Sequence, residues 1–492
     1  MVVAALIFAG MTFSDFHKRG DSMKRIFGLF TLLMLLGTQF ATARPNDRLS
    51  DLQKGWIAKA ERHERNGWIY LHIEGTPEER GFQHGYLLAP EIQEALRVLA
   101  AGWKYRSGME WPWLVGKAGE ILTSKVDAEN LAELEGMVEG MHARGITTSR
   151  DELVALNGYM EMMWYWWPQV RDSLKINSPE TRKQSCSSFI ATGSMTSDGN
   201  IVLGHNSMVG YSDPLCNIVL DIKPEKGHRI LMQAFTGFIH SGTDFFVTDA
   251  GLVGSETTIG AFFPFDPGGV PEFARMRHAT QYASSIDEWV AMMKEKNNGG
   301  YANAWLIGDI HTKEIARLEL GLKQVGYEKK SDGYFIGSNV AEDVKLLRFE
   351  TKEDELNIKH SSVARRVRWK QLMKKNVGTI DLERAKEFES DHYDTYLCVT
   401  NPDGRTLCGH YELDPMSSGL DTPFEPGGTL DGKVIDAQMA KNMSFSARWG
   451  AACGMAFDAK KFLEDHPQFD WMTGLLKDRP TEPWTVFSSG EK

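Results

Sequence analysis

The change from helical to strand-like sequence at Cys186 is the feature that most constrains how this chain can fold. Strand-like runs over residues 189–192 and 201–204 flank the turn Asp198-Gly199, and this arrangement is a strong signal for a β-hairpin. A hairpin brings the end of its second strand back beside the start of its first. The sequence therefore predicts that Cys186 heads the first strand and that His205-Asn206, which ends the second, lies close to it.

The chain is mostly helical before Cys186 and rich in strands after it. We expect one early helix to start at Pro77, after the N-cap residue Thr76. Further helices are expected over 128–143, 151–167, 271–296 and 361–374, and strands over 218–222, 229–234, 245–248, 252–258, 304–310, 315–320, 396–399 and 405–409. Runs of strands followed by runs of helices predict an α+β fold of stacked layers rather than a parallel βαβ fold.

The N-terminal region has the pattern of an export signal. Met23-Lys24-Arg25 is a basic start, residues 26–36 are apolar, and Ala41-Thr42-Ala43 is a small-x-small cleavage site. We expect cleavage after Ala43 and a secreted or periplasmic protein without stable membrane insertion; an uncleaved N-terminal anchor is the alternative. The expected segments are 1–43 (upstream residues and signal peptide), 44–185 (a mainly helical N-terminal fragment) and 186–492 (the core headed by Cys186).

Net charge and cysteine content restrict the partners. The net charge of -11 argues against nucleic acid, which requires a basic surface. Five cysteines leave at least one thiol unpaired, and a disulfide between Cys398 and Cys408, which flank a turn, is an open possibility. The segment Asp391-His392-Tyr393-Asp394 is the only dense group of ligand-type residues, and a polar loop is the favoured interpretation. We therefore expect no metal and no cofactor.

Cys186 is the best candidate for a nucleophile, because the chain contains no Gly-x-Ser-x-Gly, His-Glu-x-x-His or Walker motif. A polar linker over 177–185 precedes it. Cleavage between Ser185 and Cys186 would free an α-amine with a pKa of about 8, which can accept the thiol proton. The alternative is a buried, inert cysteine that acts as a small apolar side chain.

Several motifs follow one another along the chain: Gly204-His205-Asn206-Ser207-Met208, Ser241-Gly242-Thr243-Asp244-Phe245-Phe246, residues 251–260, Tyr301-Ala302-Asn303-Ala304-Trp305 and residues 473–484. Together they resemble motifs of the phospholipase B-like family. Residues 74–85 are similar to a segment of the C45 autoproteolytic peptidases, the acyl-coenzyme A:6-aminopenicillanic acid acyltransferases. Bile-salt and penicillin amidases carry Gly-Arg-Asn-x-Asp where this chain has Gly204-His205-Asn206-Ser207-Met208, which favours the phospholipase B-like branch.

The resemblance implies a four-layer αββα sandwich of the N-terminal-nucleophile type. It also implies autocatalytic cleavage before Cys186, after which the two fragments stay associated. Matching motif positions make Cys186 the nucleophile and place His205, Asn206, Thr257 and Asn303 in the site. Asn303 is then a candidate oxyanion donor and His205 a group that orients the amine or polarises the thiol. Asn206 is expected to hold the hairpin or the amine and Thr257 to line the pocket, and each of these residues has a purely structural alternative.

The expected activity is hydrolysis of an acyl bond, an amide or an ester, through a thioester on Cys186. The substrate is a small-molecule or lipid acyl compound. An acyltransferase that passes the acyl group to an amine and a non-catalytic binding protein of the same fold are the alternatives. Aromatic side chains at 164–167 and 262–263 favour a fatty-acyl chain or, equally, an ordinary core.

Overall fold

The computed structural model describes residues 49–171, 173–174, 185–212, 217–242, 245–414 and 424–491. The chain divides into the units Met1–Ser50 and Asp51–Lys492, and the helices and strands of the described residues belong to the second. The signal peptide expected between Met23 and Ala43 lies outside the described residues. Among the helices of the described ranges, none combines the length and apolar character that crossing a membrane requires.

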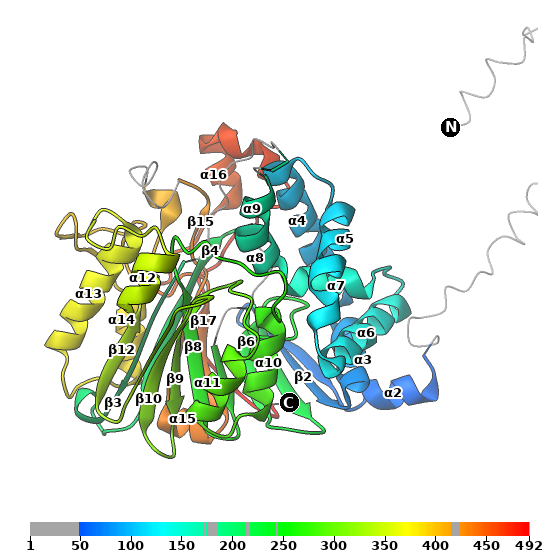
Figure 1. Ribbon diagram of the computed structural model, residues 1–492, viewed down its shortest axis with the longest axis horizontal. Coiled ribbons are helices and arrows are strands. Elements are labelled where there is room, and N and C mark those ends of the chain that lie inside the picture. The colour runs from blue at the N-terminus through cyan, green and yellow to red at the C-terminus, as the bar shows by residue number, and fades with distance from the viewer. Residues whose placement is uncertain are drawn as a thin grey trace, which may run out of the picture. The chain divides into compact units, whose positions relative to one another are not determined.

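Two stacked sheets form the centre of this unit (Figure 1). The nine-stranded sheet has the spatial order β1 (Glu61–Arg65), β2 (Trp68–Gly75), β5 (Ile218–Pro224), β6 (Ile230–Ala234), β7 (Phe245–Thr248), β8 (Leu252–Thr258), β9 (Asn303–Asp309), β10 (Glu314–Leu320) and β11 (Val325–Lys330). The seven-stranded sheet has the order β12 (Gly333–Gly337), β3 (Ser185–Thr192), β4 (Val202–Gly210), β16 (Asp431–Asp436), β17 (Ser444–Trp449) and β18 (Thr485–Ser488), and β15 (Gly427–Thr429) also pairs with β4.

Helices cover the outer face of each sheet. On the seven-stranded sheet, Trp369 of α13 (Ser361–Lys375) and Phe388 of α14 (Leu382–Glu389) pack against Phe189 of β3. On the nine-stranded sheet, Trp289 of α11 (Ile286–Lys294) packs edge-on against Trp305 of β9. Figure 1 shows α13 and α14 on one side of the sheets and α10 (Glu272–Tyr282) with α11 on the other. The predicted α+β fold with αββα layers is confirmed.

The two inner sheet faces meet in a tightly packed layer. A Cβ atom placed on Gly308 of β9 would lie 3.0 Å from the Cδ1 atoms of both Ile190 of β3 and Ile201, the residue before β4 of the facing sheet. Polar contacts cross the same layer, since the hydroxyls of Ser188 and Ser255 lie 2.6 Å apart. Side chains alternate along each strand, so these contacts identify which residues of β3 and β8 point inward.

The segment before Cys186 contributes strands as well as helices. Its helices are α2 (Asp51–Ile57), α3 (Pro77–Leu87), α4 (Ala89–Ser107), α5 (Trp111–Ile121), α6 (Ala128–Ala143), α7 (Arg150–Asn157), α8 (Tyr159–Glu161), the π-helix η4 (Met162–Trp166) and α9 (Trp167–Arg171). Thr76 caps α3 as predicted, and the structure shows that it forms a capping box with Glu79. Strand β2 pairs in parallel with β5, so the nine-stranded sheet contains strands from both sides of Cys186.

Three local expectations differ from the structure. The helix expected over 151–167 is interrupted at Gly158 and continues as the π-helix, and the one over 271–296 divides where Ser285 caps α11. The strands expected at 396–399 and 405–409 are wrong: the short pair is β13 (Tyr393–Asp394) with β14 (Val399–Thr400). The remaining α-helices of the described residues are α12 (Val344–Glu350), α15 (Ala437–Lys441) and α16 (Ala459–Asp465).

The Cys398–Cys408 disulfide is also absent, because both residues are free thiols. Cys398 occupies an exposed turn with a left-handed backbone (φ 57°), between β13 and β14. Cys408 is buried, and its sulfur lies 3.7 Å from His410 Nε2. The intervening turn therefore does not form the hairpin that would bring the two cysteines together.

Candidate active site

Cys186 is the second residue of β3 and is 3% exposed. The predicted hairpin is present, with β3 antiparallel to β4 and Cys186 paired with Ser207. Ser188, two residues further along β3, points into the layer between the sheets. Because side chains alternate along a strand, Cys186 lies on this same inner face.

Two residues far away in the sequence hold the backbone of Cys186. The Cys186 N–H donates a hydrogen bond to Asn339 Oδ1 (3.2 Å), and the Cys186 carbonyl accepts one from Arg365 Nη1 (2.5 Å). Arg365 Nη2 also donates to Asn339 Oδ1 (2.7 Å), so the three residues form a closed set of hydrogen bonds. We call Asn339 and Arg365 the Cys186 clamp. Neither residue was predicted from the sequence.

Each member of the clamp is itself fixed. Arg365 lies on α13, is fully buried, and also donates from Nη1 to Ser187 Oγ and from Nε to Ser361 Oγ. Asn339 donates from Nδ2 to the carbonyl of Thr258 at the end of β8 (2.6 Å). Its backbone has a φ of 72°, a left-handed conformation that asparagine adopts more readily than most residues with a Cβ atom. A non-glycine residue fixed in this conformation by several contacts is common at functional sites.

His205 lies on the inner face together with Cys186, since it pairs with Ser188. Its Nε2 is 2.9 Å from the carbonyl oxygen of Glu256 on the facing sheet. Burial and the charge of Lys433 lower the pKa of His205 well below its usual value, so the ring is neutral. A carbonyl only accepts hydrogen bonds, so the proton is on Nε2 and Nδ1 is left as an acceptor. Nδ1 is buried and has no hydrogen-bond partner among the described residues.

Asn206 lies on the opposite face of its sheet from Cys186, because it pairs with Ser187. Its Nδ2 donates to the carbonyl of Glu389 at the end of α14 (2.7 Å) and to that of Leu407 (3.2 Å). The amide thereby connects β4 to two segments about 200 residues later in the chain. Of the two expected roles, this position supports that of holding the hairpin rather than contacting the amine.

Thr257 and Asn303 lie on opposite faces of the nine-stranded sheet. Thr257 points inward against β12, where a Cβ on Gly337 would be 2.5 Å from Thr257 Cγ2. Asn303 pairs with Thr258 and lies two residues before Trp305, so it faces the helices α10 and α11. Both polar atoms of the Asn303 amide are buried without a hydrogen-bond partner in the described part of the chain. The structure thus brings Cys186, His205 and Thr257 to one layer and places Asn206 and Asn303 outside it.

A buried charged pair, Lys433 and Asp431, contacts Ser207 on the strand beside Cys186. Lys433 Nζ is 2.8 Å from Asp431 Oδ1 and donates to Ser207 Oγ (2.7 Å), the strand partner of Cys186. Asp431 also accepts hydrogen bonds from the Ser207 N–H and from Gln233 Nε2. A buried charge is tolerated when it is paired and hydrogen-bonded in this way. These contacts fix β4 and keep His205 beside a positive charge.

An aromatic cavity of about 750 Å³ is lined by residues other than Cys186 and its clamp. Trp164, Tyr165, Phe262, Phe263, Leu322 and Phe349 line it, with Lys323 and Lys352 among the polar residues. The chain connects the cavity to the site, because the N–H of Gly260 donates to the carbonyl of Asn339 (2.8 Å) just before Phe262. Of the aromatic residues noted at 164–167 and 262–263, Trp164, Tyr165, Phe262 and Phe263 line this cavity, whereas Trp166 and Trp167 do not.

Comparisons with known proteins agree with the predicted resemblance. The phospholipase B family model matches residues 126–322, which contain all five predicted site residues but end before Asn339 and Arg365. An uncharacterised protein of Archaeoglobus fulgidus is 26% identical over 246 residues (48% of this chain, 40% of that protein). Phospholipase B-like 2 of Bos taurus is 36% identical over 89 residues (17% and 15%), and phospholipase B-like 1 of Bos taurus is 21% identical over 420 residues (73% and 73%).

Among solved structures, the chain is similar to a mutant of the conjugated bile acid hydrolase from Clostridium perfringens, with a TM-score of 0.32 and 10% identity. That match covers 54% of this chain and 89% of the hydrolase. The matches span 40% of the archaeal relative and 15% of bovine phospholipase B-like 2. The resemblance to phospholipase B-like proteins is confirmed.

Proposed function

We propose, from the match of residues 126–322 to the phospholipase B family model and the similarity to phospholipase B-like 1, that this chain is a hydrolase of acyl bonds whose nucleophile is Cys186. One observation carries the proposal. Asn339 and Arg365 hold the N–H and the carbonyl of Cys186 at the start of a buried strand, and both of these side chains are themselves buried. A cysteine that only filled space would not require such a clamp.

The first chemical step is cleavage of the chain before Cys186. The sulfur attacks the carbonyl carbon of Ser185, the C–N bond between Ser185 and Cys186 breaks, and the thiol proton passes to the new α-amine. Water then hydrolyses the thioester, which restores the thiol and leaves a carboxylate on Ser185. The clamp supports this step because it fixes the backbone on both sides of the Cys186 Cα, which keeps the sulfur near the preceding carbonyl.

The second step uses the same groups on a substrate. The free α-amine stays beside Asn339 Oδ1, which already accepts a hydrogen bond from that nitrogen. The α-amine takes the thiol proton as the sulfur attacks the acyl carbon. It then gives this proton to the departing amine or alcohol. Water then attacks the thioester and releases the acid. Asn303 stays a predicted oxyanion donor, supported by its unpaired amide, although its strand register directs it to the helix-covered face.

Contacts across the cleavage point support continued association of the two fragments. Strand β2 pairs with β5 over seven residues, from Ile69↔Ile218 to Gly75↔Pro224. Glu133 of α6 is buried between Arg80 of α3 and Arg277 of α10. Its Oε2 lies 2.8 Å from Arg80 Nη2 and 3.1 Å from Arg277 Nη2. Separation would expose this paired charge and the sheet edge, so we expect the fragments to copurify.

The aromatic cavity supports a fatty-acyl substrate. Its volume of about 750 Å³ is within the usual range for ligand sites, and six of its fourteen lining residues are aromatic. We expect Leu322→Trp, which fills part of the cavity, to reduce turnover of long-chain esters much more than of short-chain esters. The control is Val344→Trp, at a position that is 68% exposed and not part of the lining. Equal losses for both chain lengths in Leu322→Trp would place the acyl chain elsewhere.

Trapping the acyl-enzyme tests the proposal. The purified protein is mixed with a panel of acyl amides and esters, quenched in acid, and analysed by peptide mass. We expect one acyl group on the peptide that begins at Cys186, lost in Cys186→Ala and retained in Cys398→Ala, which removes an exposed thiol instead. Acylation elsewhere, or turnover in Cys186→Ala, would reject the nucleophile. An added amine that captures the acyl group in place of water would identify the acyltransferase.

A further inference from the structure

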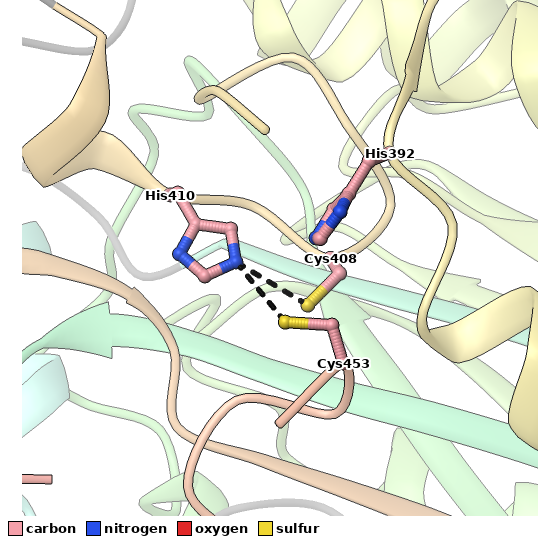
Figure 2. A group of neighbouring side chains, drawn as sticks. All are labelled: His392, Cys408, His410 and Cys453. Carbon is pink, nitrogen blue, oxygen red and sulfur yellow. Dashed lines mark hydrogen bonds between the residues drawn. The ribbon is translucent and has the colours of Figure 1, made fainter. Parts of the chain in front are cut away.

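Four side chains of metal-ligand type converge behind the seven-stranded sheet, away from the layer that contains Cys186. They are His392, Cys408, His410 and Cys453, and one ligand atom from each lies within 4.8 Å of all the others (Figure 2). Cys408 and His410 are buried, and the other two residues are partly buried. We propose that these four residues bind one zinc ion in a tetrahedral Cys₂His₂ site.

The spacing of the ligand atoms fits zinc. His410 Nε2 lies 3.7 Å from Cys408 Sγ and 3.5 Å from Cys453 Sγ. Zinc bonds of about 2.3 Å to sulfur and about 2.0–2.1 Å to nitrogen place the two atom types about 3.5–3.6 Å apart at the corners of a tetrahedron. Two sulfurs with two imidazole nitrogens form a ligand set that selects zinc over harder cations such as magnesium or calcium.

The surroundings orient the ligands as they do in known zinc sites. Glu412 Oε1 lies 3.0 Å from Nδ1 of His410, on the side of the ring away from the sulfurs. A carboxylate at this position accepts the Nδ1 proton and leaves Nε2 as the free ligand atom. The N–H of Cys408 donates to the carbonyl of Asp391 (3.1 Å), which fixes Cys408 beside the neighbouring His392. Nε2 of His392 is buried and has no hydrogen-bond partner among the described residues.

The site would connect three separate segments of the chain. His392 follows α14, Cys408 and His410 lie in the loop after β14, and Cys453 follows β17. The same region contains the contacts of Asn206, whose amide bonds the carbonyls of Glu389 and Leu407, next to these ligands in sequence. With four protein ligands, no coordination position remains for a substrate, so the role of the ion is to stabilise the fold.

A disulfide between Cys408 and Cys453 is the chemical rival, because an oxidising compartment favours it. Zinc binding instead releases one proton from each thiol and leaves both sulfurs reduced and coordinated to the ion. The two outcomes differ in metal content, in thiol count and in mass. They can therefore be separated in a single preparation.

The test is metal analysis of the tag-free chain, purified without chelators from zinc-supplied cells. We expect one zinc ion per chain, lost in Cys408→Ser and in His410→Asn but retained in Cys398→Ser. Addition of a strong chelator should lower the melting temperature of the wild type and leave that of Cys408→Ser unchanged. A wild type that contains no zinc, whether or not peptide mapping finds a Cys408–Cys453 disulfide, would overturn the proposal, as would full zinc content in Cys408→Ser.

A second measurement does not depend on the folding of any variant. Metal-depleted wild-type protein is titrated with Co²⁺, which replaces zinc and reports its ligands in the visible and near-ultraviolet spectrum. We expect intense tetrahedral bands together with thiolate-to-cobalt charge transfer, saturating at one ion per chain. Weak octahedral bands, or the absence of charge transfer, would reject a site made of two thiolates.

Discussion

Replacing Arg365 by methionine removes the charged half of the Cys186 clamp while keeping an unbranched side chain in the same space. In the wild type the guanidinium donates to the Cys186 carbonyl, to Ser187 Oγ and to Asn339 Oδ1, and its side chain is fully buried. The substitution removes the guanidinium donor from all three acceptors, and Asn339 Oδ1 keeps the hydrogen bond from the Cys186 N–H. Asn339 then becomes free to turn away from the Cys186 N–H.

These contacts determine how far Arg365→Met should change the stability and the cleavage rate of the chain. Each hydrogen bond to a charged group contributes about 1.5–3 kcal/mol, and relief from burying the guanidinium offsets part of the sum. We therefore expect Arg365→Met to lower the free energy of unfolding by about 2–4 kcal/mol. We also expect chain cleavage to slow at least about tenfold, since about 1.4 kcal/mol of lost positioning in the transition state has that effect.

Stability and processing are measured in different backgrounds. Urea unfolding is compared in chains that also carry Cys186→Ala, so that neither is cleaved, and processing is followed by intact mass in chains with Cys186 present. The matched control is Arg366→Met: Arg366 is the next residue on α13 and pairs with Glu342, and both side chains are 20% exposed. In the Arg366→Met control, the free energy of unfolding should fall by about 1 kcal/mol or less, and the chain should be cleaved at the wild-type rate. Cleavage of Arg365→Met at the wild-type rate would refute the clamp.

Three further predictions concern the other site residues. Asn206→Ala should lower the free energy of unfolding by about 2–4 kcal/mol in urea, because two buried carbonyls lose their donor, whereas unchanged stability would contradict the hydrogen bonds to Glu389 and Leu407. Asn303→Ala should reduce kcat for acyl substrates with little loss of stability, and an unchanged kcat would remove Asn303 from the oxyanion site. The pKa of His205 is lowered on folding, so its contribution to stability is present above about pH 6.5 and declines as the pH falls below that value. His205→Asn should therefore flatten the fall in stability between neutral and acidic pH, and an identical pH profile would argue against a neutral buried ring.

Local sequence signals predicted the elements around the site. The turn at Asp198-Gly199 and the strand-like runs beside it identified the β3–β4 hairpin, because a hairpin depends on residues that are neighbours in sequence. The hairpin brings both His205 and Asn206 near Cys186, but this closeness does not show which of them lies on the same face of the sheet as Cys186. Counting side-chain alternation from Cys186 through the register would have placed His205 on its face and Asn206 on the other.

The Cys186 clamp and the zinc ligands could not be predicted from local pattern. Asn339 and Arg365 are 153 and 179 residues away from the atoms they contact in β3. Neither lies in a recognisable motif, and only the tertiary fold brings α13 beside β3. The four proposed zinc ligands come from three segments, so no spacing of cysteine and histidine along the chain reveals them.

The central claim is that Cys186 becomes an N-terminal nucleophile, and N-terminal sequencing combined with intact mass tests it most directly. Protein purified from an exporting host should contain two copurifying fragments, of which the second begins Cys186-Ser187-Ser188, and Cys186→Ala should remain a single chain. A single wild-type chain that retains the Ser185–Cys186 bond, under conditions where it turns over an acyl substrate, would contradict the account.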